Sequence, residues 1–283
     1  MSDSSNITKP KLSFSGLNGS NLEESKTLLD HVCLEIASRF NLYQSNGKPH
    51  KSAIIETFAK SACLACVTNK FSDQKVTNNV DAIYKECHKL AVNILLEELY
   101  YLLNQMGYKV LVSTEAELEY GKVDVLVTVT NYGLNLKNSA KELLVEIKTG
   151  NSLSLTQIFR YLMDSRSDTI IVWRIRRRQV LVFDVHEVKP LLTEFVRMLC
   201  LKGMRLLSAE HIQPCQHERE RCHQPKQNEL EQMFRDFSKA LIETLPSILQ
   251  IITEKLGIST LQLNEDARIN EKDSPDSQGD ANV

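Results

Sequence analysis

The 283-residue chain contains 42% hydrophobic and 25% charged residues, a composition typical of soluble globular proteins, and we expect one folded body with frayed ends. No stretch approaches the roughly 18 uninterrupted apolar residues that a membrane span needs, and residues 1–16 lack the apolar core of a signal peptide, so we expect a cytoplasmic protein without a membrane partner. The formal net charge of -2 excludes a global attraction to nucleic acid, but without the acidic segment 264–283 the remainder is close to neutral.

The first part of the chain predicts helices. Residues 1–22 have no periodic apolar pattern, whereas residues 28–40 and 52–67 have helical spacing. The strongest helical pattern covers residues 80–106, and Gly107 follows it as a stop signal. Its apolar residues recur every three or four positions and are Val92, Leu95, Leu96, Leu99, Leu102, Leu103 and Met106.

Short runs rich in β-branched residues follow. They predict strands at 108–113, 123–130, 142–148, 169–175 and 180–184. Helical patterns at 153–163, 188–201 and 230–256 interrupt or follow these strands. This order predicts an α/β fold with a mixed sheet flanked by helices.

The same patterns divide the chain into six segments. They are a disordered arm (1–22), a helical lead-in (23–78), a core (79–202), a polar linker (203–227), a C-terminal helix (228–262) and a disordered acidic tail (263–283).

Two neighbouring predicted strands carry charged residues among apolar ones. Because side chains alternate along a strand, Glu146 and Lys148 point to the same face. Asp124 lies on the preceding strand, and pairing of the two strands would bring it near Glu146. Strands this apolar are usually buried, which argues against a solvated ion pair. Two carboxylates a few ångströms apart bind a hard cation such as Mg²⁺, and an adjacent lysine can position a water.

These residues resemble the motifs of the PD-(D/E)XK nuclease superfamily, in its RecB-like branch. The matching elements are GKVD ending at Asp124, EIK from Glu146 to Lys148, and QIFRY from Gln157 to Tyr161. The resemblance covers about residues 80–184 and depends on the order and spacing of the elements. One departure is that Val123, not proline, precedes Asp124.

The resemblance implies a restriction-endonuclease-like core that binds Mg²⁺ or Mn²⁺. Asp124 and Glu146 would hold the metal, with the Ile147 carbonyl as a further ligand. Lys148 would orient the attacking water, and Gln157 and Tyr161 would position the scissile phosphate or support the site. The family commonly adds an acidic residue on the preceding helix, for which Glu98 is the candidate; a solvated helix flank is an equal alternative.

A run of arginines lies at the expected turn between the last two strands. The guanidinium groups suit DNA phosphates, although charged hairpin turns are also ordinary solubilising features, and both interpretations stay open. The residues are Arg174, Arg176, Arg177 and Arg178.

The cysteines predict reduced thiols, because an odd number of them is scattered along the chain. Some RecB-like nucleases hold an iron-sulfur cluster, but the spacing of Cys200, Cys215 and Cys222 does not reproduce theirs, and we predict none. A zinc ion could bind Cys215, His217, Cys222 and His223. That segment lacks a regular finger spacing, so we interpret it as a polar linker.

The sequence thus predicts a metal-dependent nuclease that hydrolyses DNA, by endonuclease or exonuclease action, as a homodimer or within a repair or defence complex. The first alternative is a non-catalytic module of the same fold that binds nucleic acid or supports an assembly. The second is a structural protein whose terminal helices mediate oligomerisation.

Overall fold

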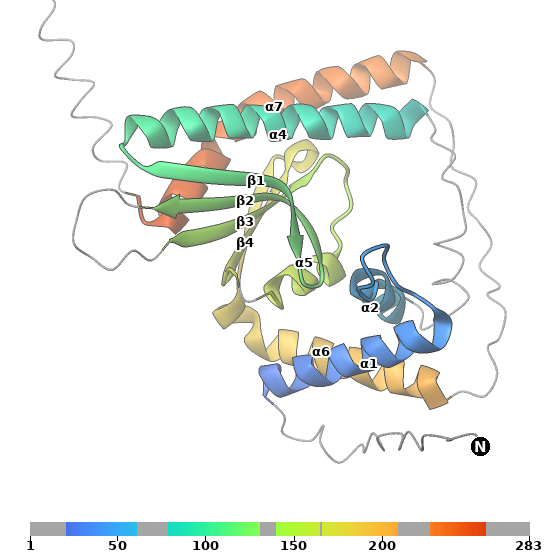
Figure 1. Cartoon of the computed structure of the whole chain (residues 1–283). Coiled ribbons are helices and arrows are strands. Elements are labelled where there is room, and N and C mark those ends of the chain that lie inside the picture. Colours follow the sequence, from blue (N-terminus) through green and yellow to red (C-terminus); the bar gives the residue numbers. More distant parts are fainter. Residues whose placement is uncertain (1–20, 61–78, 131–139, 165, 209–226, 259–283) are drawn as a thin grey trace, which may run out of the picture. The chain divides into compact units, whose positions relative to one another are not determined.

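The computed structural model describes residues 21–60, 79–130, 140–164, 166–208 and 227–258 (Figure 1). The chain forms two compact units where one folded body was expected. Unit 1 comprises Met1–Asp73 and Glu187–His217, and unit 2 comprises Gln74–His186 and Glu218–Val283. Within the described ranges, no helix has the length and apolar character that crossing a membrane requires.

Unit 1 is helical and contains α1 (Leu22–Phe40), α2 (Lys51–Lys60) and most of α6 (Val185–Ser208). Helix α1 begins six residues earlier than predicted, because the Asn21 side chain caps it by accepting a hydrogen bond from the Glu24 backbone N–H at 2.9 Å. The predicted helix at 52–67 is observed as far as Lys60, and its remainder lies outside the described residues. Residues 187–202, which the sequence grouped with the core, therefore cluster with α1 and α2.

Gly203 of α6 gives a test of this packing. A Cβ atom at this position would lie 2.3 Å from Val32 Cγ1 and 3.0 Å from Phe58 Cε2, so alanine overpacks the interface. We expect Gly203→Ala to lower the free energy of unfolding of unit 1 by about 1–3 kcal/mol in a thermal melt. Leu191→Ala, at an exposed position of the same helix, should change it by less than about 0.5 kcal/mol. A wild-type melting curve for Gly203→Ala would mean that α6 does not pack this way.

Unit 2 is built on a five-stranded mixed sheet with the order β1-β2-β3-β4-β5. The strands are β1 (Lys109–Leu118), β2 (Gly121–Thr130), β3 (Lys141–Lys148), β4 (Thr169–Arg174) and β5 (Gln179–Asp184). Strands β3 and β4 are parallel and joined through α5 (Leu155–Leu162), and all other neighbours are antiparallel. The predicted mixed sheet flanked by helices is confirmed.

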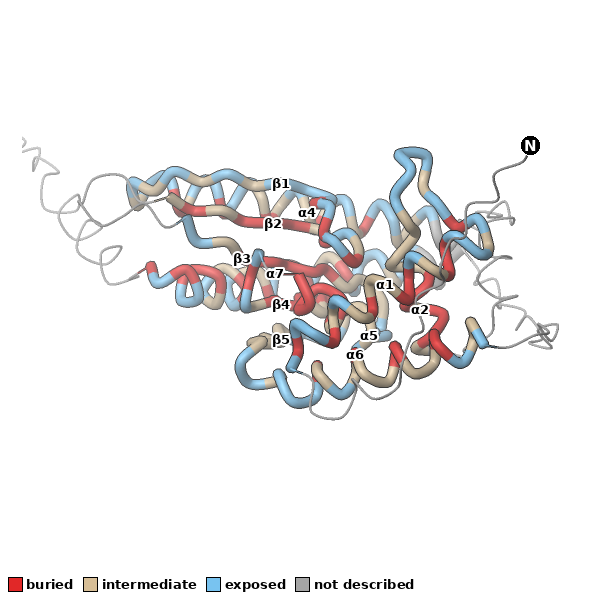
Figure 2. Tube along the Cα trace, turned by 60° about the horizontal axis from the view of Figure 1, so that its bottom comes forward, coloured by how far each residue is buried: buried red, intermediate tan, exposed pale blue. Residues whose placement is uncertain are grey.

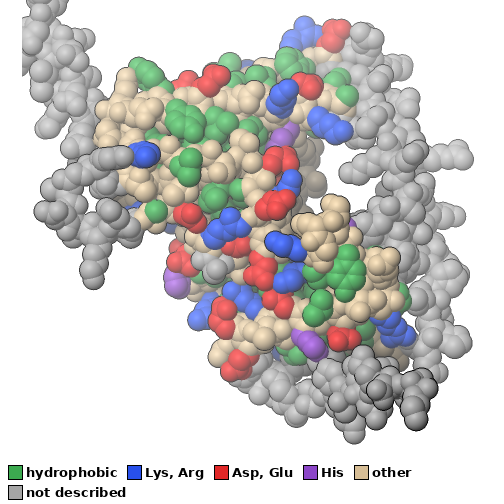
Figure 3. All heavy atoms as spheres, in the orientation of Figure 1, with side chains coloured by type: hydrophobic (Ala, Val, Ile, Leu, Met, Phe, Trp, Pro, Cys, Tyr) green, Lys and Arg blue, Asp and Glu red, His purple; other side chains and the backbone are tan. Residues whose placement is uncertain are grey.

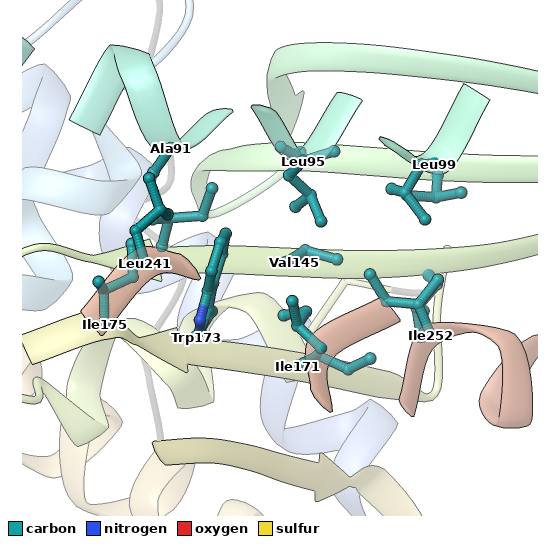
Figure 4. Close-up of a cluster of buried hydrophobic side chains, with 14 of the residues drawn as sticks. Ala91, Leu95, Leu99, Val145, Ile171, Trp173, Ile175, Leu241 and Ile252 are labelled. Carbon is teal, nitrogen blue, oxygen red and sulfur yellow. The ribbon is translucent and has the colours of Figure 1, made fainter. Parts of the chain in front are cut away.

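Helices α4 (Asn79–Gln105) and α7 (Gln227–Leu256) cover one face of this sheet (Figure 1). Figure 4 shows side chains from both helices meeting side chains of β3 and β4, among them Leu95, Val145, Trp173 and Leu241. The indole Nε1–H of Trp173 donates to Thr244 Oγ1 of α7 at 2.8 Å, so the one buried polar group of this side chain has a partner. Along the tube in Figure 2, β3 and β4 are largely buried, whereas much of β1 is exposed.

The β1–β2 hairpin departs from regular pairing at one position. The register runs from Lys109↔Thr130 to Leu118↔Gly121 but omits the pair between Glu115 and Asp124. Glu115 has a positive φ of 51°, a conformation that is uncommon for residues other than glycine. On the other side of β2, pairing with β3 begins only at Val125↔Val145. Asp124 therefore lies at an interruption of both ladders.

Candidate active site

Where the β2–β3 ladder is interrupted, the Asp124 carboxylate takes the place of a backbone carbonyl as acceptor for a β3 N–H. The Ile147 N–H of β3 donates to Asp124 Oδ2 at 2.7 Å, at the point where β2 no longer pairs with β3. The second oxygen, Oδ1, lies 3.2 Å from His88 Nε2 of α4. Asp124 is thus held between a strand and a helix, and its carboxylate is directed by two different elements.

Glu146 and Lys148 share one face of β3, as the alternation predicted. Lys148 Nζ lies 2.6 Å from Glu146 Oε1. Glu146 is 2% exposed, and its second oxygen, Oε2, is buried and has no hydrogen-bond partner among the described residues. A buried charged oxygen without a partner is costly, so this atom needs a proton or a cation.

Gln157 and Tyr161 of α5 complete the cluster. Ser154 caps this helix by accepting from the Gln157 backbone N–H, and the four-residue spacing then directs both side chains to β2 and β3. Gln157 accepts from Lys148 Nζ at 2.7 Å, and its Nε2 donates to Glu146 Oε1 at 2.7 Å and to the Tyr161 hydroxyl at 2.6 Å. The Tyr161 hydroxyl in turn donates to the Lys122 carbonyl oxygen. Residues from three segments therefore form one hydrogen-bonded cluster.

The electrostatics of the cluster oppose the charge on Glu146. Burial and then the nearby Asp124 carboxylate raise the pKa of Glu146 to about 7, against the opposing effect of Lys148. The hydrogen bond with Asp124 raises the pKa of His88 above its ordinary value, despite partial burial. Burial raises the pKa of Tyr161, so its hydroxyl stays protonated and remains a donor.

His88 is a residue of the cluster that the family motifs do not include and that the sequence did not single out. The sequence did contain a signal that His88 faces the sheet. His88 lies seven residues before Leu95, so it continues the N-terminal end of the buried stripe that includes Leu95 and Leu99. An imidazole on that stripe must meet the sheet, and here it meets Asp124.

Glu98, the acidic residue selected on the same helix, is not brought into the cluster. It is exposed on α4, ten residues after His88, which is about 15 Å along a helix axis. The cluster contacts the N-terminal half of α4, and Glu98 lies in the other half.

The arginine run has several different environments. Arg176 donates to the Tyr84 hydroxyl of α4 at 2.9 Å. Arg178 lies 2.5 Å from Glu243 of α7. Arg177 is exposed on the 3-10 turn Ile175–Arg177. Arg174 is paired in register with Lys148 and donates to the Asn151 carbonyl oxygen in the loop after β3. Only Arg174 of the four is thus aligned with a cluster residue in the strand register.

Figure 3 shows one face of the molecule, on which Lys and Arg side chains are interspersed with acidic ones and hydrophobic side chains gather over the strands of unit 2. The proposed zinc ligands at residues 215–223 lie outside the described residues.

The donor set of the cluster fits a hard cation. Within the described ranges, no three His, Cys, Asp or Glu side chains are already spaced as ligands of a metal ion. The unpartnered Glu146 Oε2 and the Asp124 carboxylate nevertheless offer oxygen atoms, the ligands that Mg²⁺ and Mn²⁺ prefer. Comparison of the chain with protein-family models, with curated proteins and with solved structures finds no match.

Proposed function

We propose that this protein is a metal-dependent nuclease that hydrolyses DNA phosphodiester bonds, with a restriction-endonuclease-like core of the RecB-like kind in unit 2. One observation carries the proposal. Asp124, Glu146, Lys148, Gln157 and Tyr161 come from three segments and meet in one cluster that contains a buried carboxylate oxygen without a partner. The arrangement of three antiparallel strands followed by α5 and a parallel strand supports the same core.

Each residue of the cluster has a distinct role in this proposal. Asp124 and Glu146, with the Ile147 carbonyl, hold a Mg²⁺ or Mn²⁺ ion. When bound, the ion lowers the pKa of a water and offsets the charge that develops on the phosphate. His88 holds one oxygen of Asp124 and fixes the direction of the carboxylate.

Lys148 orients the attacking water. Its ammonium group has three donors, and Glu146 and Gln157 accept two of them, so one remains for a water or a phosphate oxygen. Gln157 keeps the ammonium in place, and Tyr161 fixes Gln157 to the backbone of β2. The Lys148 side chain is 20% exposed, which allows a substrate to reach it.

Cleavage assays test this function. Linear double-stranded, linear single-stranded, circular single-stranded and branched DNA are incubated with Mg²⁺ or Mn²⁺, with the wild-type protein and with Asp124→Ala. We expect cleavage by the wild type and none by Asp124→Ala. Glu97→Ala, which removes an exposed carboxylate of α4, should cleave like the wild type. DNA binding without cleavage of any substrate would instead support a non-catalytic module.

A further inference from the structure

The tip of the β1–β2 hairpin lies beside α5 (Figure 1). Side chains from α5 and from the residues that follow it bind this tip. Arg160 Nη1 donates to the Tyr120 carbonyl oxygen at 3.1 Å, and the Glu119 backbone N–H donates to Asp164 Oδ2 at 2.9 Å. Tyr161 donates to the carbonyl oxygen of Lys122, and Arg166 to that of Glu117. We call Arg160 and Asp164, with the two backbone groups that they bind, the hairpin clamp.

Both members of the hairpin clamp are charged and buried. Arg160 is 8% exposed and its Nε has no partner in the part of the chain that the structure describes, while Asp164 is 6% exposed and lies 3.4 Å from Arg166. Burying a charge costs more than burying a hydrophobic side chain of similar volume, so stability alone does not explain these two residues.

The tip also packs closely on α5. A Cβ atom on Gly121 would lie 3.2 Å from Tyr161 Cε1 and 3.6 Å from Arg160 Nη1. A larger residue at this position would push the hairpin away from the helix. The tip therefore has little freedom to move while the clamp is intact.

The clamp acts on the part of β2 that does not pair with β3. The β2–β3 ladder begins at Val125, and the β1–β2 register omits Asp124. Backbone pairing with β3 therefore does not fix the segment from Gly121 to Asp124. Three contacts link this segment to the rest of the site, namely Tyr161 with Lys122, the Ile147 N–H with Asp124, and His88 with Asp124.

We propose that Arg160 and Asp164 are positioning residues of the nuclease site, which hold the hairpin tip on α5 so that Asp124 stays against β3, beside Glu146. Their importance for cleavage rests on the proposed function, whereas their effect on the hairpin does not. Loss of the clamp frees the hairpin tip and weakens the hold on Asp124, and it leaves Glu146, Lys148 and Gln157 in place on β3 and α5.

Hydrogen exchange tests the clamp without metal or DNA. The Ile147 amide reports on Asp124 directly, because its hydrogen bond goes to that carboxylate. In Arg160→Leu and Asp164→Asn, we expect this amide to exchange at least about tenfold faster, while the Val145 amide of the same strand keeps its protection. Arg160→Lys retains a donor for the Tyr120 carbonyl and should restore most of the protection. Ile252→Val, a mild truncation in the α7 core, controls for lowered stability.

Cleavage as a function of Mg²⁺ concentration gives the second readout. Supporting residues around metal ligands typically change metal affinity by about 10- to 100-fold, so the half-saturating Mg²⁺ concentration should rise by that factor in Arg160→Leu. The rate at saturating Mg²⁺ should fall much less. Unchanged exchange at Ile147 in both Arg160→Leu and Asp164→Asn overturns the clamp, even if the wild type cleaves DNA. Absence of wild-type cleavage overturns the proposed function, and the exchange measurement still decides the clamp.

Discussion

Replacing Lys148 with methionine should reduce the rate constant of DNA cleavage by about 100- to 1,000-fold, the usual effect of removing a donor that acts on the reacting atoms. Methionine keeps most of the side-chain volume but removes the ammonium group that donates to Glu146 and Gln157. Metal binding should persist, because Asp124 and Glu146 remain. Single-turnover cleavage at saturating Mg²⁺ measures the effect.

Lys122→Met is the matched control for this change. The Lys122 side chain is about half exposed and its ammonium group lies 3.7 Å from Glu115, outside the cluster, although its backbone carbonyl accepts from Tyr161. This variant should cleave at nearly the wild-type rate. If Lys148→Met retained more than a tenth of the wild-type rate, Lys148 would not orient the attacking water.

Glu146→Gln should abolish cleavage and at the same time stabilise the metal-free protein. Burial raises the pKa of Glu146 to about 7, which means that the carboxylate form is disfavoured in the folded state. Glutamine removes this buried charge, so we expect the free energy of unfolding in a metal chelator to rise by about 1 kcal/mol. The gain is no larger because Lys148 loses its charged partner. Added Mg²⁺ should raise the melting temperature of the wild type but not of this variant.

The dependence of the protein's stability on pH follows from the raised pKa of Glu146. A carboxyl group with a raised folded pKa binds its proton more tightly in the folded state, so its stabilising contribution is complete below pH 4.5 and is lost as the pH rises to about 7. The raised pKa of His88 acts in the same direction, since its contribution is complete below pH 6.5 and is lost above that. The wild type should therefore lose stability between about pH 4.5 and 7 relative to Glu146→Gln.

Denaturant melts in a metal chelator at several pH values measure this difference. Glu142→Gln, a change of a partly exposed residue on the same strand, should parallel the wild type. If the curves of the wild type and Glu146→Gln ran parallel across this range, Glu146 would not have a raised pKa.

The sequence was sufficient to predict helices, strands and their faces where a residue pattern repeats along the chain. The apolar stripe of α4 and the β-branched runs predicted the elements of unit 2, and alternation along β3 placed Glu146 and Lys148 on one face. Strand β1 extends five residues beyond the predicted Ser113. The sequence did not predict this extension, because the segment from Thr114 to Glu117 is rich in polar residues and contains the irregular Glu115. Alternation of polarity is lost from Ser113 to Glu115, which are consecutive exposed residues.

The remaining features depend on contacts between distant residues and have no periodic signal. Arg160 donates to a backbone carbonyl and Asp164 accepts from a backbone N–H, each about 40 residues away, and any residue type except proline provides both groups. The contact of His88 with Asp124 depends on where α4 crosses the sheet. The grouping of α6 with α1 and α2 also depends on packing between segments far apart in sequence.

Binding of Mn²⁺ tests most directly whether Asp124 and Glu146 form the metal site of a nuclease. Electron paramagnetic resonance would count bound Mn²⁺ in the wild type and in Asp124→Asn, and DNA cleavage would be measured in the same samples. We expect the wild type to bind Mn²⁺ and cleave DNA, and Asp124→Asn to lose both while it keeps its fold. Cleavage that persists in Asp124→Asn, or a wild type that binds no Mn²⁺ at millimolar concentration, would contradict this site.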